Sequence, residues 1–310
     1  MKKSNLFANC VFAVSFLLVA MSFTACSSDD SNDAVTVVGQ VVENTEAPFS
    51  VVLKAINSEG NDITPKGEVN SATLFVFDQN NDFVKQVSVD KSAILNRNAI
   101  QIECPNTNKI TVIAWSGISS SNEEISSLSQ ANIISDLQVS LKNNNGVASI
   151  PSDLFYGQAT IQKNNTKAGS SSELTIARKT SVFNLTTKGL IKYMGDTKGE
   201  YTYKIKKTRS SFDYNGQMTG EEVEYMAPAS FDNNGNLVAA SMTILPSDQV
   251  TVELYKDGNL VFSSQNDQNG EILSAKAGKQ SDIVFKYSST VSTNVLIADW
   301  GTVIQHVTIG

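Results

Sequence analysis

Apolar and polar residues alternate along most of the chain, so that every second position is apolar in many short runs. A period of two is typical of β-strands with one face in a core, whereas a helix repeats after about 3.6 residues. The runs are rich in Val, Ile, Thr and aromatic residues and end at Asn, Asp, Gly or Ser, which mark turns. We predict strands at 36–42, 50–56, 72–78, 100–104, 109–115, 173–179, 201–207, 250–255, 282–287 and 294–300.

One segment, residues 121–138, has helical spacing instead. Asn122 is placed to cap a helix there, and Ile125, Leu128 and Leu137 would face inward. The segment has many serines and a single alanine, so its helix propensity is low. We expect a short helix or an ordered loop, and hence an all-β fold with at most short helices.

Two halves of the chain share a plan. Residues 73–87 read as a hairpin and are followed by a strand that ends in Trp115, and residues 252–264 form a second hairpin, around Asp257-Gly258, followed by a strand that ends in Trp300. The polar stretch 162–172 resembles a linker. We predict two related β-sandwich domains, 35–168 and 169–310. The alternative is that any all-β chain would yield two such hairpins by chance.

The N-terminus has the three parts of an export signal: Lys2 and Lys3, an uncharged run from 6 to 20, and small residues before Cys26. It resembles a bacterial lipoprotein signal, in which the cysteine is acylated and becomes the mature first residue, although Phe23 departs from the usual leucine. We predict a signal peptide at 1–25, lipid attachment at Cys26 and a flexible acidic tether at 26–34. An ordinary secretory signal is the alternative.

Charge and cysteine content narrow the class of protein. Losing Lys2 and Lys3 with the leader takes the formal charge from −7 to −9, and no basic cluster offsets it, which argues against nucleic acid as a partner. Beyond Cys26 only Cys104 remains, so no internal disulfide is expected. We interpret Cys104 as a small buried residue at a strand end.

No catalytic motif is apparent. His306 is the only histidine, and the chain has no nucleophile elbow, phosphate-binding loop or zinc-protease motif. The acidic clusters at 123–124 and 221–224 are interpreted as solvated faces. The oxygen-rich segments 78–82 and 266–271 are interpreted as hairpin turns rather than calcium sites. We therefore predict neither an enzyme nor a bound cofactor or metal.

The C-terminal run 300–310 is the candidate for contact with a neighbouring molecule. It places Val303, Gln305, Val307 and Ile309 on one strand face. Such a strand either closes its own sheet or is donated to another subunit, and closing its own sheet is the more common behaviour of a terminus.

Several motifs together resemble the fimbrillin superfamily of Bacteroidetes. They are FVFDQNNDFVKQV, the strand end Ala114-Trp115-Ser116-Gly117, Leu154-Phe155-Tyr156-Gly157, and LTIARKTSVFNLTTKGL around Arg178. The resemblance spans roughly Val35 to Gly310. It implies two tandem transthyretin-like Greek-key β-sandwich domains in a lipoprotein of the outer membrane and cell surface, serving as a shaft, anchor or tip subunit of fimbriae.

The resemblance also implies the partners. Subunits of the superfamily join by strand donation, and outer-membrane lipid would hold the acylated Cys26; a host or bacterial surface molecule is a further expected ligand. Shaft subunits lose their N-terminal segment to a protease that cuts after Arg. Here the first arginine is Arg97, inside the first predicted domain, and the first lysine after Cys26 is Lys54, within a predicted strand. We therefore expect an anchor or minor subunit acting in adhesion.

The alternative function is glycan binding. Outer-membrane lipoproteins with β-sandwich domains hold polysaccharides on exposed aromatic platforms. Trp115 and Trp300 both follow predicted strands, where core packing is the more common role for a tryptophan.

Overall fold

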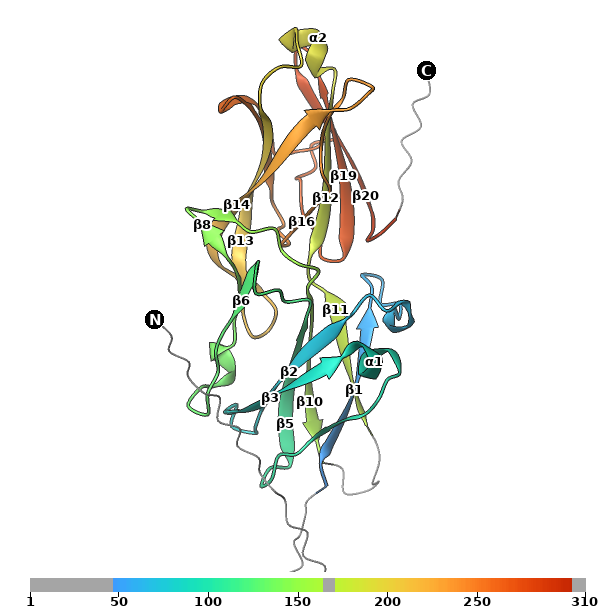
Figure 1. The fold of residues 1–310 in the computed structure, drawn as a ribbon, viewed down its shortest axis with the longest axis vertical. Coiled ribbons are helices and arrows are strands. Elements are labelled where there is room, and N and C mark those ends of the chain that lie inside the picture. The colour runs from blue at the N-terminus through green and yellow to red at the C-terminus, as the bar shows by residue number, and fades with distance from the viewer. Residues whose placement is uncertain (1–46, 164–170, 303–310) are drawn as a thin grey trace, which may run out of the picture. The chain divides into compact units, whose positions relative to one another are not determined.

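The computed structural model describes residues 47–163 and 171–302, and its regular structure is almost entirely β (Figure 1). Seven strands form the first sheet, in the order β3-β2-β5-β10-β11-β1-β4. Their bounds are β1 (Phe49–Ile56), β2 (Ser71–Phe77), β3 (Phe83–Asp90), β4 (Ile100–Ile102), β5 (Lys109–Ser116), β10 (Phe155–Gln162) and β11 (Ser172–Arg178). All neighbours are antiparallel except β1 and β11, which run parallel.

The second sheet has 13 strands, and its main path is β18-β17-β13-β14-β15-β12-β19-β20. On this path lie β12 (Ser181–Lys188), β13 (Tyr201–Phe212), β14 (Met218–Phe231), β15 (Leu237–Ala239), β17 (Thr251–Lys256), β18 (Asn259–Ser264), β19 (Lys279–Tyr287) and β20 (Val291–Asp299). The short strands beside it are β6 (Glu123–Ile125), β7 (Val139–Leu141), β8 (Asn143–Asn144), β9 (Val147–Ala148) and β16 (Met242–Ile244). Here β12 and β19 form the extended parallel pair.

The helices are short, which confirms the predicted all-β class. They are α1 (Lys91–Leu95), α2 (Leu190–Met194) and the single 3₁₀ turns η1 (Thr64–Lys66) and η2 (Ile134–Asp136). Asp90 caps α1 by accepting from the backbone N–H of Ala93 at 2.8 Å. No helix within 47–163 or 171–302 is long and apolar enough to cross a bilayer.

The segment 121–138 is an ordered loop rather than an α-helix. It contains β6 and η2, and Asn122 caps no helix. Its apolar residues nevertheless face the core, as predicted. Leu137 is fully buried, and Ile125 and Leu128 are partly buried against the same cluster. The segment does not form an α-helix because its serine-rich sequence has a low helix propensity, although its apolar residues have helical spacing.

The strand pattern predicted from alternation is confirmed wherever the structure describes it; residues 36–42 lie outside the described residues. Both predicted hairpins form, as β2–β3 and β17–β18. Asp257 and Gly258 both have positive φ, 49° and 77°, which is the type I′ geometry that Asp-Gly favours. Cys104 is buried just after β4, and burial raises the pKa of its thiol.

Two apolar clusters share the first sheet. The residues of β5 point alternately into them: Val112 and Ala114 into the cluster that α1 and β1 help to enclose, Ile113 and Trp115 into the cluster that continues under the second sheet. Both faces of β5 are therefore buried, which explains why its sequence is almost continuously apolar.

The passage from one sheet to the other falls between β11 and β12. β11 lies after the predicted boundary at Gly169, yet it pairs with β1 and β10 of the first sheet. Conversely, β7 lies well before that boundary and pairs with β13 of the second sheet. The division into domains 35–168 and 169–310 stays a prediction.

Gly157 on β10 provides a test of how closely the first sheet is packed. A Cβ at this position would clash with the backbone carbonyl of Thr175, which cannot swing aside as a side chain can. We expect Gly157→Ala to lower the free energy of unfolding by about 3 kcal/mol. Gly270→Ala is the control, because its Cβ meets open space and only the positive φ of 87° is unfavourable, at a cost of about 1 kcal/mol. Denaturant unfolding measures both, and equal losses would contradict the packing argument.

Candidate functional site

Arg178, the last residue of β11, is the most densely partnered charge in the described structure. Its Nε donates to Asp153 Oδ1 at 2.6 Å, and its Nη2 donates to Asp153 Oδ2 at 2.8 Å and to Glu68 Oε2 at 2.7 Å. The guanidinium carbon also lies 4.7 Å from the ring centre of Phe155 and 4.3 Å from that of Trp300. The paired hydrogen bonds and the stacking both need a planar guanidinium.

Arg178 stays protonated although its side chain is only 4% exposed. Burial alone would lower its pKa, but the hydrogen bonds and charges of Asp153 and Glu68 together raise the pKa above its ordinary value. The side chain is thus a permanent cation between two carboxylates, which suits it to hold segments together and not to transfer protons.

Trp300 belongs to a turn that follows β20, and this turn is fixed at several points. The N–H of Trp300 donates to the carbonyl of Gly278 at 3.2 Å, and the N–H of Thr302 donates to the carbonyl of Asp299 at 3.1 Å. The carboxylate of Asp299 accepts from Lys279 and, at 2.9 Å, from Ser58. The hydrogen bond from Lys279, then that from Ser58, keeps the pKa of Asp299 below its usual range.

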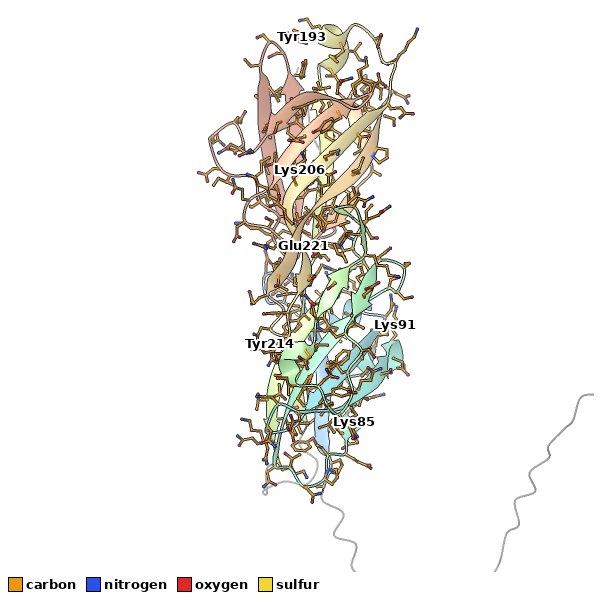
Figure 2. The ribbon with its side chains drawn as sticks, turned by 90° about the vertical axis from the view of Figure 1, so that its left-hand side faces the viewer. Lys85, Lys91, Tyr193, Lys206, Tyr214 and Glu221 are labelled. Atoms are coloured by element: carbon orange, nitrogen blue, oxygen red, sulfur yellow. The ribbon has the colours of Figure 1, made fainter. Side chains whose placement is uncertain are left out.

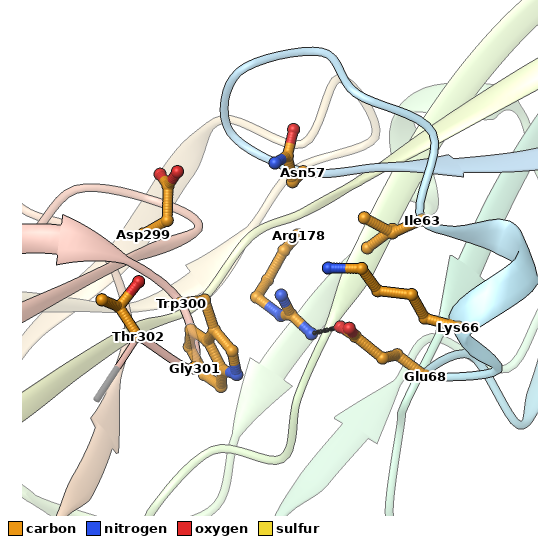
Figure 3. A pocket seen from close by; sticks show the side chains of 9 residues that line it. All are labelled: Asn57, Ile63, Lys66, Glu68, Arg178, Asp299, Trp300, Gly301 and Thr302. Atoms are coloured by element: carbon orange, nitrogen blue, oxygen red, sulfur yellow. Dashed lines mark hydrogen bonds and ion pairs between the residues drawn. The ribbon is translucent and has the colours of Figure 1, made fainter.

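A pocket of about 300 Å³ opens beside these residues (Figure 3). The side chains that line it are of both charges: Lys66 and Arg178 are cationic, and Glu68 and Asp299 are anionic. Since each anion already has a cationic partner, the pocket has no excess charge to attract an ion. Its complete lining is Asn57, Ile63, Lys66, Glu68, Arg178, Asp299, Trp300, Gly301 and Thr302.

The edges of the two sheets are the other candidate sites. Among the described residues, β3 and β4 border the first sheet, and β18 and β20 border the main path of the second. The first sheet protects its edges, because β4 has three residues and β3 carries Lys85, a residue type that discourages strand pairing (Figure 2). The edge strands of the second sheet carry exposed apolar residues instead: Leu260, Leu296 and Ile297.

The acidic residues singled out in the sequence have structural roles. The interpretation of residues 123–124 as a solvated face is wrong for Glu123, which is buried and accepts hydrogen bonds from the backbone N–H groups of Ser119 and Ser152, at 2.7 Å and 2.6 Å. Asp78 and Asp267 each accept two N–H groups of their own hairpin turns, as the turn interpretation requires. Within the described ranges, no group of three or more His, Cys, Asp or Glu side chains is placed to hold a metal.

The remaining predicted site residues divide into two groups. Cys26, Val303, Gln305, His306, Val307 and Ile309 lie outside the described residues, so the predicted lipid attachment and the subunit contact stay predictions. Trp115 is in the core, 1% exposed, as its apolar strand indicated. Trp300 is half-buried and packs against Arg178.

Arg178 was not predicted as an organising residue, although a signal was present. Leu174, Ile176 and Arg178 occupy alternate positions of one strand, so the pattern that buries the first two also points the arginine inward. A buried cation needs anionic or hydrogen-bonding partners. The sequence did not indicate which they were, since Glu68 precedes Arg178 by 110 residues.

An all-β fold with exposed apolar residues on the edge strands of one sheet, and with its buried arginine ion-paired, is typical of a structural or binding protein. The family model for fimbrillin-A associated anchor proteins Mfa1 and Mfa2 matches residues 42–306. The chain therefore belongs to this family of fimbrial anchor proteins.

Known relatives agree with this assignment. The chain is similar to the major fimbrium anchoring subunit FimB of Porphyromonas gingivalis, with 22% identity over 308 residues that cover 96% of each chain. Among solved structures it is similar in fold to the fimbrial anchor protein Mfa2 of the same organism, at a TM-score of 0.58 and 14% identity, covering 82% of this chain and 97% of that one.

A second solved structure has a closer fold. It belongs to a Bacteroides thetaiotaomicron protein for which polysaccharide binding is proposed, with a TM-score of 0.64 and 19% identity, covering 84% of this chain and 99% of that one. The family places this chain in a fimbrium at the cell surface, in contact with other fimbrial subunits. Its relatives are structural subunits and adhesins.

Arg178→Lys tests whether the guanidinium of Arg178 stabilises the fold through Asp153, Glu68 and Trp300. A lysine keeps the charge but can neither bind Asp153 through two parallel hydrogen bonds nor stack on Trp300, so we expect a loss of about 2 kcal/mol in the free energy of unfolding. Lys54→Met is the control, because it removes a more exposed ion pair with Glu173 of the same strand β11 and should cost less than about 1 kcal/mol. If both variants unfold at the same denaturant concentration, Arg178 has no special role.

Proposed function

We propose that this protein is a fimbrial anchor subunit held in the outer membrane by lipid on Cys26, with its β-rich body on the cell surface. Two or three acyl chains, at about 0.8 kcal/mol per buried methylene, hold a soluble body on a bilayer. The residues after Cys26 are acidic and polar, as a tether between membrane and body requires.

The observation that carries this proposal is the extent of the family match. It reaches from residue 42 to residue 306, and the similarity to the anchoring subunit FimB covers nearly all of both chains. A shared domain alone would leave part of one chain unmatched. The first arginine of the sequence, Arg97, lies between α1 and β4 of the first sheet, so cleavage after it would remove β1 to β3. An anchor that keeps its N-terminal segment fits this arrangement better than a processed shaft subunit.

We further propose that the protein joins neighbouring subunits by strand addition, and so takes part in fimbrial assembly and in adhesion to host or bacterial surfaces. Main-chain hydrogen bonds would supply the affinity, and alternate side chains would supply the register. The exposed apolar residues on β18 and β20 support this proposal, because sheet edges without Lys or Pro at these positions invite pairing. On the C-terminal run, Val303, Gln305, Val307 and Ile309 are the proposed contact residues.

Cys26→Ala tests the anchor. We expect the full-length wild-type protein to fractionate with the outer membrane and to carry an acylated N-terminal cysteine, and the variant to be absent from that fraction, because its alanine has no thiol to acylate. Ser27→Ala leaves the thiol in place and should behave as wild type. Fractionation with mass analysis of the N-terminus measures both. Wild-type protein found in the soluble fraction, or with a new N-terminus beyond Cys26, would contradict the proposal.

Glycan binding is the second candidate, favoured by one observation. The pocket at Trp300 combines an aromatic ring with amide, carboxylate and cationic groups, the chemistry that recognises sugars, and polysaccharide binding is proposed for a protein of similar fold. One face of Trp300 is already covered by Arg178, which leaves less of the ring for stacking. A polysaccharide that retards the wild-type protein in an affinity gel, but not Trp300→Ala, would establish this function.

A further inference from the structure

Several turns of the described structure share one hydrogen-bonding scheme. Each begins at an Asp or Asn whose N–H donates to the carbonyl four residues on and whose carbonyl accepts the N–H three residues on. Its side-chain oxygen accepts the N–H groups two and four residues on. The residue three positions on has a positive φ in every case. These turns begin at Asn57, Asp78, Asp213, Asp232 and Asp267.

Three of these turns contain an Asn-Gly pair, at 215–216, 234–235 and 269–270. The N–H of Gly216 donates to Asp213 at 2.9 Å, that of Gly235 to Asp232 at 3.0 Å, and that of Gly270 to Asp267 at 3.1 Å. The amide nitrogen of each glycine is therefore held inside its turn.

The fourth Asn-Gly pair, Asn145-Gly146, is built differently. It joins β8 to β9, and its φ values of 51° and 84° define a two-residue type I′ hairpin. The hydrogen bond of such a turn joins the two flanking residues, so the N–H of Gly146 takes no part in it. Both residues are exposed, and a Cβ on Gly146 would meet no atom within 4 Å.

This hairpin is attached to the second sheet at one point (Figure 1). Val147 pairs in parallel with Glu224 of β14, and the N–H of Glu224 donates to the carbonyl of Gly146 at 2.9 Å. β15 pairs with β14 only at residues 229–231. The hairpin thus takes over the edge of β14 at Glu224, where β15 no longer reaches.

We propose that Asn145 is a site of spontaneous deamidation, and that the reaction releases the β8–β9 hairpin from β14. Asparagine is among the chemically labile residues. The backbone nitrogen of Gly146 loses its proton to the solvent and attacks Cγ of Asn145. The bond from Cγ to the side-chain nitrogen breaks, and this nitrogen takes up a proton and leaves as ammonia.

Water then opens the cyclic imide that has formed. Attack of water at Cγ gives aspartate, whereas attack at the backbone carbonyl carbon gives an isoaspartyl linkage, in which the main chain runs through the side chain. The other three Asn-Gly pairs resist the reaction, because their glycine nitrogen first has to leave its hydrogen bond.

The products no longer suit the hairpin. The isoaspartyl linkage adds a methylene group to the main chain between residues 145 and 146, so the two-residue turn cannot keep its geometry. Both products also add a negative charge to a hairpin that is paired with the acidic run 221–224, where like charges repel. The N–H of Glu224 then loses its acceptor. This inference concerns the chain's own chemistry and does not depend on the proposed function.

Peptide mapping with mass analysis tests the site of reaction. We expect the folded full-length protein, kept in a mildly alkaline buffer, to lose Asn145 at least about tenfold faster than Asn215, Asn234 or Asn269. In the protein unfolded by guanidinium the four sites should react at similar rates, because the turns are absent. Similar rates in the folded protein, or an Asn145 that stays intact there, would overturn the proposal.

Asp267→Ala is the matched control. The surroundings of Gly270 are as open as those of Gly146, so the two sites differ in their hydrogen bonds and not in crowding. The substitution removes the carboxylate that accepts the N–H groups of Asn269 and Glu271. Deamidation of Asn269 should accelerate at least about tenfold, with Asn145 unchanged. An Asn269 that still reacts slowly would show that the turn bonds do not protect it, against the proposal.

Amide exchange measures the release of the hairpin. The N–H of Glu224 should exchange at least about tenfold faster in the deamidated protein than in fresh protein, while the β14 amides that bond to β15 stay protected. Asn145→Gly is the control, because Gly-Gly also forms a type I′ turn but has no side-chain amide to lose. After the same incubation it should retain the protection of Glu224. Unchanged exchange at Glu224 in the deamidated protein would contradict the release.

Discussion

The backbone of an open sheet leaves one row of N–H and C=O groups unpaired at each edge, and this constraint governs what the molecule can do. Burial of apolar side chains explains why the strands form, but it does not decide where a sheet ends. The first sheet ends in a three-residue strand and in a strand that carries Lys85. The second sheet ends in strands with exposed leucine and isoleucine. Among the described edge strands, the exposed leucine and isoleucine residues therefore belong to the second sheet.

Arg178 connects this edge with the first sheet. Its guanidinium binds Glu68, which precedes β2, and Asp153, which precedes β10. The same guanidinium stacks on the ring of Trp300 in the turn after β20. Ser58 adds a hydrogen bond to Asp299 of the same turn. The direction in which the chain leaves β20 is thus fixed by residues that lie more than a hundred positions away in the sequence.

Local alternation was sufficient to predict the strands and hairpins, because a half-buried strand imposes a period of two and Asp257-Gly258 imposes a turn. It could not predict the order of strands. The two hairpins looked equivalent in sequence, yet β2 pairs with β5, which ends near Trp115, whereas β17 pairs with β13, and Trp300 follows the edge strand β20. The parallel pairing of β1 with β11 and the partners of Arg178 are likewise long-range contacts, which no local pattern specifies.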